Sequence, residues 1–212
     1  LHPQMQEVFI RKLDEIAAVF SAEQGTPWPV QFVVSTHSSH VANEAHFETI
    51  RYFLSAMDEN NSALRTVVKD LRKGFAGKGE SERNFLHQYM TLTRCDLFFA
   101  DKVILIEGTT ERLLLPRIMK MIDEEQLEDK RLGSQYVSVM EVGGAYAHIF
   151  FDLLEFLELR ALIITDIDTV KLNNNGRYVS CHLQEGQKTS NACIKHWFDD
   201  PEVAPTYLVA VE

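Results

Sequence analysis

Apolar residues in the first half of the chain follow several different patterns. In residues 4–20 they recur at three- and four-residue steps, which predicts an amphipathic helix. A glycine and two prolines interrupt this pattern in residues 25–29. The continuous apolar, β-prone run that follows predicts a short buried strand at residues 31–35. Residues 43–95 are mostly polar, and we expect them to be largely helical.

The second half of the chain alternates between short apolar runs and longer amphipathic stretches. The short runs predict strands at residues 102–106, 136–142 and 161–165, and the longer stretches predict helices at 109–125 and 147–159. A further strand-like run covers 206–211. Near-continuous apolar strands that alternate with helices are typical of a largely parallel sheet. The pattern predicts an α/β fold with a Rossmann-like parallel sheet flanked by helices, preceded by a mostly helical N-terminal part.

Acidic residues follow two of the predicted strands. Glu107 comes directly after the first strand and Glu111 lies four residues later, whereas Asp166 and Asp168 follow the third. Ligand sites in parallel sheets lie at the carboxyl ends of the strands, and clustered carboxylates suit Mg²⁺ or Mn²⁺. Each cluster alone has a simpler explanation, because glutamate is favoured at helix N-termini and aspartate in turns.

The overall composition restricts the class of protein. The formal net charge of −10 argues against a module that binds nucleic acid through a broad basic surface. No apolar run is long enough to span a membrane. The three cysteines, Cys95, Cys181 and Cys193, have no CxxC spacing, and we expect them to be reduced thiols of a cytoplasmic protein.

Three short motifs together resemble the Toprim domain, and in particular that of the OLD (overcoming lysogenization defect) family of ATP-dependent nucleases. They are the EGTTE sequence of residues 107–111, the Gly-Gly pair at 143–144 and the DID sequence of 166–168. The sequence GQKTSN at 186–191 also resembles the OLD pattern. The resemblance implies a divalent-metal site formed by Glu107, Asp166 and Asp168, with Glu111 as a further ligand.

The same resemblance implies an activity. It predicts a DNA endonuclease that hydrolyses phosphodiester bonds with two Mg²⁺ or Mn²⁺ ions, held by the four carboxylates as the catalytic residues. Glu107 could alternatively act as a general base. OLD nucleases also carry a later acidic residue and a lysine. Lys171 and Lys188 are the candidates for that lysine in this chain.

The N-terminal residues resemble the end of an ABC-type ATPase domain. LHPQ at residues 1–4 resembles the segment after a Walker B motif, and STHS at 35–38 resembles a switch loop in which His37 would sense the γ-phosphate. We therefore expect an ATPase remnant in residues 1–45, a helical connecting region in 46–98 and a Toprim nuclease domain in 99–212. The sequence has no Walker A motif, so ATP would act only in a longer protein, with its N-terminal ATPase domain as partner.

Two questions stay open at the level of sequence. The basic, glycine-bearing segment with Lys69, Arg72, Lys73 and Lys78 is either a DNA-backbone contact or a solvated loop. The whole chain is either a nuclease or a non-catalytic module that binds DNA and assembles an ABC-type ATPase. A second copy of the chain is a candidate partner in both cases.

Overall fold

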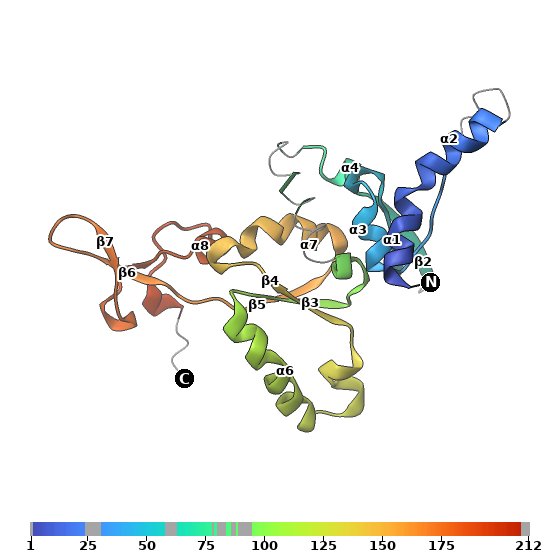
Figure 1. Cartoon of the computed structure of the whole chain (residues 1–212). Coiled ribbons are helices and arrows are strands. Elements are labelled where there is room, and N and C mark those ends of the chain that lie inside the picture. The colour runs from blue at the N-terminus through green and yellow to red at the C-terminus, as the bar shows by residue number, and fades with distance from the viewer. Residues whose placement is uncertain are drawn as a thin grey trace. The chain divides into compact units, whose positions relative to one another are not determined.

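A computed structural model describes most of the chain and divides it into two compact units (Figure 1). The described residues are 2–23, 31–57, 63–77, 79, 84–85, 88 and 95–208. The first unit is Leu1–Phe99 and the second is Ala100–Glu212. Among the described residues, no helix has both the length and the apolar character needed to cross a membrane.

The first unit contains helices at its beginning and a β-hairpin further along. Its helices are α1 (Pro3–Arg11), α2 (Leu13–Glu23), α3 (Ser39–Glu44) and α4 (Leu71–Gly74), with short 3-10 helices at Phe47–Thr49 (η1) and Cys95–Phe99 (η2). Polar pairs join α1 to the segment that leads into and forms α3: Ser38 Oγ donates to Gln6 Oε1 at 2.6 Å, His40 Nδ1 lies 3.1 Å from Glu7 Oε1, and Arg11 binds Glu44.

The hairpin corrects the prediction of a helical segment at residues 46–98. Strands β1 (Arg51–Met57) and β2 (Leu64–Asp70) pair antiparallel, from Arg51 opposite Asp70 to Met57 opposite Leu64. Alternate residues of β1 are half-buried, and the ring of Tyr52 lies 6.1 Å from that of Phe98. β1 contains the aromatic residues Tyr52 and Phe53, and β2 contains three β-branched residues in a row, Thr66 to Val68, which pack well on a pleated surface and disfavour a helix.

The strand predicted at residues 31–35 is also wrong. The structure assigns no strand there, and the side chain of Val33 is 90% exposed. Apolar composition alone does not make a strand, because a strand also needs a neighbour that pairs with its backbone N–H and C=O groups. Within the described residues, this segment has no such neighbour.

The second unit is built on a parallel sheet, as predicted. Its strand order is β4-β3-β5, with β3 (Lys102–Ile106) parallel to both β4 (Val137–Glu141) and β5 (Arg160–Ile163). Helix α6 (Thr109–Glu124) follows β3 and runs on past Pro116. Two 3-10 helices, η3 (Glu128–Lys130) and η4 (Leu132–Ser134), precede β4, and η5 (Gly144–Phe150) leads into α7 (Phe151–Leu157). The predicted helix at 147–159 therefore begins as a 3-10 helix.

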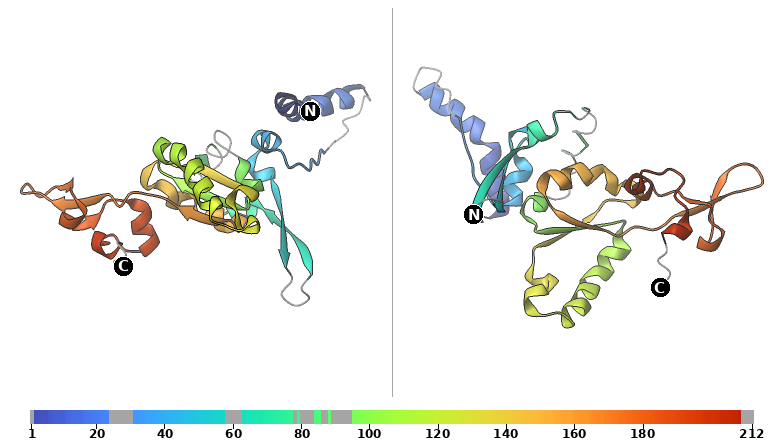
Figure 2. Two further views of the ribbon diagram at one scale, coloured as in Figure 1. Left: turned by 90° about the horizontal axis from the view of Figure 1, so that it is seen from below. Right: turned by 180° about the vertical axis from the view of Figure 1, so that it is seen from behind.

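Helices cover both faces of this sheet, with α6 on one side and α7 on the other (Figures 1 and 2). On one face, Ile104 and Ile106 pack with Leu115 of α6. Successive strand residues point to opposite faces, so Val103 and Leu105, which are also buried, face the other layer. This double burial explains why β3 is apolar from Val103 to Ile106 and could be recognised in the sequence.

A smaller antiparallel sheet follows the parallel one. Its order is β7-β6-β8, formed by Tyr178–Ser180, Thr169–Leu172 and Lys188–Thr189 respectively. The remaining elements are η6 (Leu183–Glu185), α8 (Ala192–Phe198) and η7 (Pro205–Tyr207). The strand-like run predicted at 206–211 is therefore wrong at its start, and residues 209–211 lie outside the described residues.

Candidate active site

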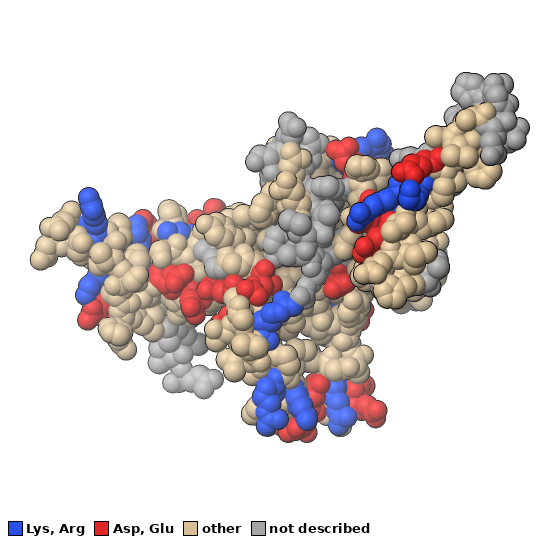
Figure 3. Space-filling model, in the orientation of Figure 1, with Lys and Arg blue, Asp and Glu red and all other residues tan. Residues whose placement is uncertain are grey.

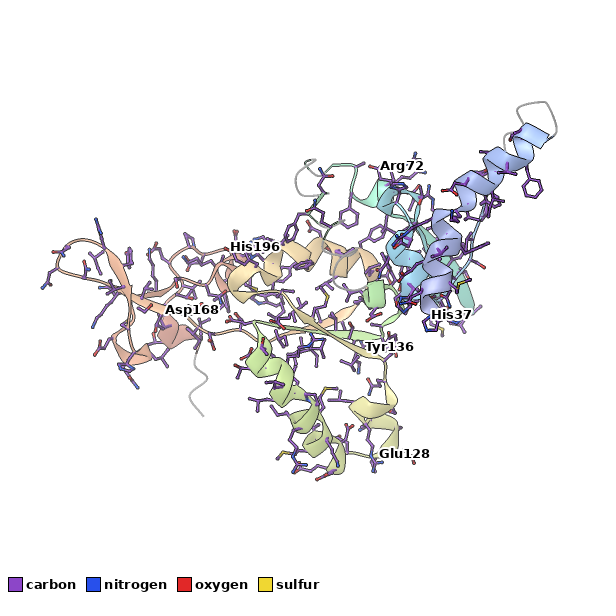
Figure 4. The ribbon with its side chains drawn as sticks, viewed as in Figure 1. His37, Arg72, Glu128, Tyr136, Asp168 and His196 are labelled. Carbon is purple, nitrogen blue, oxygen red and sulfur yellow. The ribbon has the colours of Figure 1, made fainter. Side chains whose placement is uncertain are left out.

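The acidic motifs predicted from the sequence meet at one edge of the parallel sheet. Glu107 follows β3 directly, and a hydrogen bond of 2.8 Å from the Ile164 N–H to the Leu105 carbonyl carries the pairing beyond β5 towards Asp166. Figure 3 shows acidic side chains gathered where β3 ends and the chain leads on to β6, and Figure 4 labels Asp168 on this link. Parallel strands bring their carboxyl ends to the same edge, which explains the convergence.

Glu107 is held in place by the segment that follows β5. Its Oε1 accepts a hydrogen bond of 2.8 Å from the backbone N–H of Asp166 and a second, short one from the hydroxyl group of Thr165. Among the described residues no donor contacts Oε2 of Glu107. One oxygen is thus fixed by the protein, and the other stays available for a ligand.

Asp168 has a raised pKa. Partial burial of its carboxyl group raises its pKa above the ordinary value, and the charges of Glu107 and Asp166 raise it further, while a hydrogen bond with Asn191 lowers it. The residue as a whole is still exposed. Its φ of 51° lies in the left-handed region, which is unfavourable for a residue with a side chain. The carboxylates of Asp166 and Asp168, on a locally strained loop, and that of Glu107, at the end of β3, therefore act on one another.

Glu111 lies in the first turn of α6 and has a structural role there. Its Oε2 accepts a hydrogen bond of 3.0 Å from the backbone N–H of Gly108, which satisfies a free donor at the start of the helix. This contact supports the simpler explanation of Glu111 as a helix-start residue. Its predicted role as a metal ligand stays a prediction.

Glu141 is an acidic residue at this edge that the sequence analysis missed. It ends β4, opposite Ile106 of β3, and its Oε1 lies 3.5 Å from the hydroxyl group of Thr109. Its position at the end of a predicted strand was a usable signal. The motif comparison passed over it because it stands before the Gly-Gly pair and outside the motif.

The carboxylates suit a hard divalent cation in their chemistry. Within the residues that the structure describes, no group of three or more His, Cys, Asp or Glu side chains is arranged as a finished metal site. Burial raises the pKa of Asp168, and the charges of Glu107 and Asp166 raise it further, so negative charges lie close together here. A bound Mg²⁺ or Mn²⁺ would offset this repulsion, and oxygen donors are the ligands these ions prefer.

The two candidate lysines have other partners. Lys171 is paired with Glu185, while Lys188 donates to Glu202 Oε1 at 2.7 Å and lies 4.0 Å above the centroid of the Tyr178 ring. These contacts raise the pKa of each lysine, mainly through the hydrogen bond to its carboxylate. Both ammonium groups are thus bound to carboxylates outside the predicted metal set.

The remaining predicted site residues belong to the first unit. Lys69 lies in β2, and Arg72 and Lys73 lie exposed in the short helix α4, whereas Lys78 lies outside the described residues. His37 is exposed in the extended segment before α3. Figure 4 labels His37 and Arg72 within this unit. Their predicted roles in nucleotide sensing and DNA contact stay predictions.

Comparison with known proteins supports the resemblance found in the motifs. Residues 98–168 match the family described as "Overcoming lysogenization defect protein-like, TOPRIM domain". The chain is also 29% identical over 208 residues to Endonuclease GajA of Bacillus cereus (strain HuB5-5). That alignment covers 94% of this chain and 29% of the relative, so the chain spans less than a third of that protein's length. All four predicted carboxylates lie within the matched Toprim segment.

Proposed function

Since residues 98–168 match the OLD-like Toprim family, we propose that this chain is the nuclease part of an OLD-family DNA endonuclease and that its activity depends on divalent metal. The metal would be Mg²⁺ or Mn²⁺, with two ions as the working hypothesis. The printed name of the relative, an endonuclease, supports the reaction class. An ATPase domain in the same longer protein is the proposed partner.

One observation carries the proposal. Asp168 has a pKa raised partly by the charges of Glu107 and Asp166, although these residues come from two motifs 59 residues apart. A fold gains no stability from bringing like charges together, so such an arrangement is typical of a functional site. Carboxylates at the carboxyl ends of parallel strands are also where the Toprim resemblance requires them.

The chain's own residues would bind and orient the divalent ions. Glu107 is fixed through Oε1 and presents Oε2, and Asp166 and Asp168 supply further oxygen ligands on the neighbouring loop. When bound, the divalent ions would activate water and stabilise negative charge on the phosphate and the leaving oxygen. Since the carboxylates repel an approaching phosphate while they are unpaired, DNA would bind productively only after their charge is offset.

The test compares the parent chain with two aspartate variants. Supercoiled plasmid and linear duplex DNA are incubated with Mg²⁺, Mn²⁺, Ca²⁺ or a chelator, and nicked and cut products are measured over time. The parent should nick or cut only with Mg²⁺ or Mn²⁺. Asp166→Ala should lose several orders of magnitude in rate, because it removes a charge that holds the ion. Asp129→Ala, which removes an exposed carboxylate of the same unit, is the matched control.

The possible outcomes separate the competing functions. Cleavage by Asp166→Ala at the parent's rate would contradict the metal-dependent mechanism. Cleavage by the parent in the presence of chelator would also contradict it. A parent that binds DNA without cutting it under all conditions would favour the non-catalytic assembly module. The Asp129→Ala control should cut as the parent does.

A further inference from the structure

A short segment downstream of the acidic motifs runs along the loop that carries them. Strand β8 pairs antiparallel with β6, with Thr169 opposite Thr189 and Val170 opposite Lys188. Gly186, at the start of the GQKTSN sequence, fits closely against the residue that follows this loop, because a Cβ there would lie only 3.0 Å from the side chain of Thr169. Residues 186–191 thus form a neighbouring layer to the Asp166–Asp168 loop.

Three successive residues of this segment bind three successive carbonyl groups of the loop. The amide of Asn191 donates to the Asp166 carbonyl at 2.9 Å. The hydroxyl group of Thr189 donates to the Ile167 carbonyl, and Ser190 donates to the Asp168 carbonyl through its N–H at 2.8 Å and its hydroxyl group at 3.0 Å. We call residues 189–191 the loop clamp.

The loop clamp explains how Asp168 keeps its unfavourable backbone. A left-handed residue persists only where its surroundings over-determine it. Here the carbonyls of the strained residue and of the two before it each have a donor, so relaxation of the loop would break several hydrogen bonds at once. Thr189 and Asn191 are both 0% exposed, which keeps water from replacing these contacts easily.

Asn191 also controls the proton of Thr165. Its Nδ2 donates to Thr165 Oγ1 at 2.7 Å, and its Oδ1 accepts the Ile194 N–H at 3.1 Å, which caps α8. An amide nitrogen donates only, so Thr165 must accept from Asn191, and its single hydroxyl proton points to Glu107 Oε1. The buried amide thereby orients one donor on Glu107, and it steadies the second donor, the Asp166 N–H, through the neighbouring carbonyl.

We infer that Asn191 is a positioning residue of the metal site: it acts through Thr165 and the Asp166 backbone to set the orientation of Glu107 and of the two aspartates. This inference rests on the proposed function for its consequence, which is tighter binding of the divalent ion. Groups that orient metal ligands typically contribute about 10–100-fold in metal affinity. Asn191 has this effect without being a ligand itself.

The experiment uses Asn191→Ser, which removes the donors to Thr165 and Asp166 while a serine can still cap α8. Calorimetric titration with Mn²⁺ should show affinity weakened about 10–100-fold, with a thermal unfolding midpoint close to the parent's. Asn191→Thr, which also keeps a hydroxyl group that can cap α8, is the second variant in case the first does not fold. Asn174→Ser, in the exposed turn between β6 and β7, is the matched control.

A double-mutant cycle separates this role from general support of the fold. Thr165→Val removes the hydroxyl group through which Asn191 is inferred to act. Because Asn191 is inferred to act through Thr165 as well as through the Asp166 backbone, the loss of Mn²⁺ affinity in the double variant should be smaller than the sum of the two single losses. Additive losses, or an Asn191→Ser chain with parental affinity, would overturn the inference.

A second measurement needs no metal. Amide hydrogen exchange at Asp166 in the metal-free chain should be about 10-fold faster in Asn191→Ser, which corresponds to the loss of roughly one hydrogen bond. Unchanged exchange would count against the positioning role. If the parent itself binds no Mn²⁺, the proposed function fails, and this exchange measurement still decides whether Asn191 holds the loop.

Discussion

The backbone N–H of Asp166 donates a hydrogen bond of 2.8 Å to Glu107 Oε1, although the two residues are 59 positions apart in the chain. This contact joins the two acidic motifs through an atom that no side-chain substitution at Asp166 removes. The geometry of Glu107 should therefore survive changes to the Asp166 carboxylate. Loss of function in Asp166 variants then reports on charge and ligation instead of collapse of the site.

Asp168→Asn should stabilise the metal-free chain while it weakens metal binding. Asparagine removes a charge that is repelled by Glu107 and Asp166, and it tolerates the left-handed backbone of this position well. Because Asp168 is exposed and water screens this repulsion, we expect a gain of roughly 0.2–1 kcal/mol in unfolding free energy at neutral pH. Thermal and denaturant unfolding in chelator would measure it. A less stable variant would contradict the view that this site stores repulsion.

The stability of the metal-free chain should depend on pH through Asp168. Its pKa in the folded chain is raised above the ordinary value of 3.8, so the folded state holds this proton more tightly than the unfolded state. The resulting stabilisation is present at low pH and is lost as the pH rises through the raised pKa. The difference in unfolding midpoint between Asp168→Asn and the parent should therefore widen with rising pH. Saturating Mn²⁺ should narrow it again by stabilising the parent, and a difference independent of pH would show that the folded state does not shift this pKa.

Glu111→Gln and Glu111→Ala together should separate the two roles considered for Glu111. Glutamine keeps an oxygen for the Gly108 N–H but removes the charge, whereas alanine removes both. Alanine should cost about 0.3–1.5 kcal/mol of stability and glutamine much less. If Glu111 is also a metal ligand, both variants should bind Mn²⁺ more weakly. Parental Mn²⁺ affinity in Glu111→Gln would leave only the helix-start role, and Glu128→Gln is the control.

Lys73→Ala should weaken DNA binding if the basic segment contacts the phosphate backbone. Lys73 is exposed on α4, next to the exposed Arg72. Loss of one phosphate contact should reduce the slope of log affinity against log salt by about one unit, equally for different DNA sequences. Fluorescence anisotropy over a series of salt concentrations measures this slope. An unchanged slope, equal to that of Lys120→Ala on α6, would identify the segment as an ordinary solvated surface.

The parallel sheet could be predicted from sequence because its central strand is buried on both faces from Val103 to Ile106 and is therefore apolar at each of these positions. The hairpin of β1 and β2 could not be predicted in this way. One face of each strand is exposed and yet carries large apolar residues such as Phe53, which is 66% exposed. Polar and apolar residues do not alternate there, and the low apolar content of the surrounding sequence suggested helix. At residues 31–35 the sequence predicted a strand that the structure does not have, because these apolar residues have no pairing strand among the described residues.

The candidate site was predictable in part for a similar reason. Glu107, Asp166 and Asp168 stand at strand ends, and the ends of parallel strands necessarily meet. The contacts of Thr189, Ser190 and Asn191 depend on how a later loop folds back, which no local pattern specifies. Apart from its place in the GQKTSN sequence, Asn191 left one local signal, a polar residue just before an apolar helix, and that signal indicates a cap without indicating what else the amide binds.

The order of residues along the chain gives the loop clamp a consequence for protein synthesis. Asn191 lies 25 and 26 positions after the two groups to which its amide donates. A nascent chain that ends before Thr189 contains all four carboxylates but none of the three residues that hold their loop. The acidic edge would therefore exist on the ribosome before it is organised, and its final geometry would appear only when the downstream segment emerges and folds back onto it.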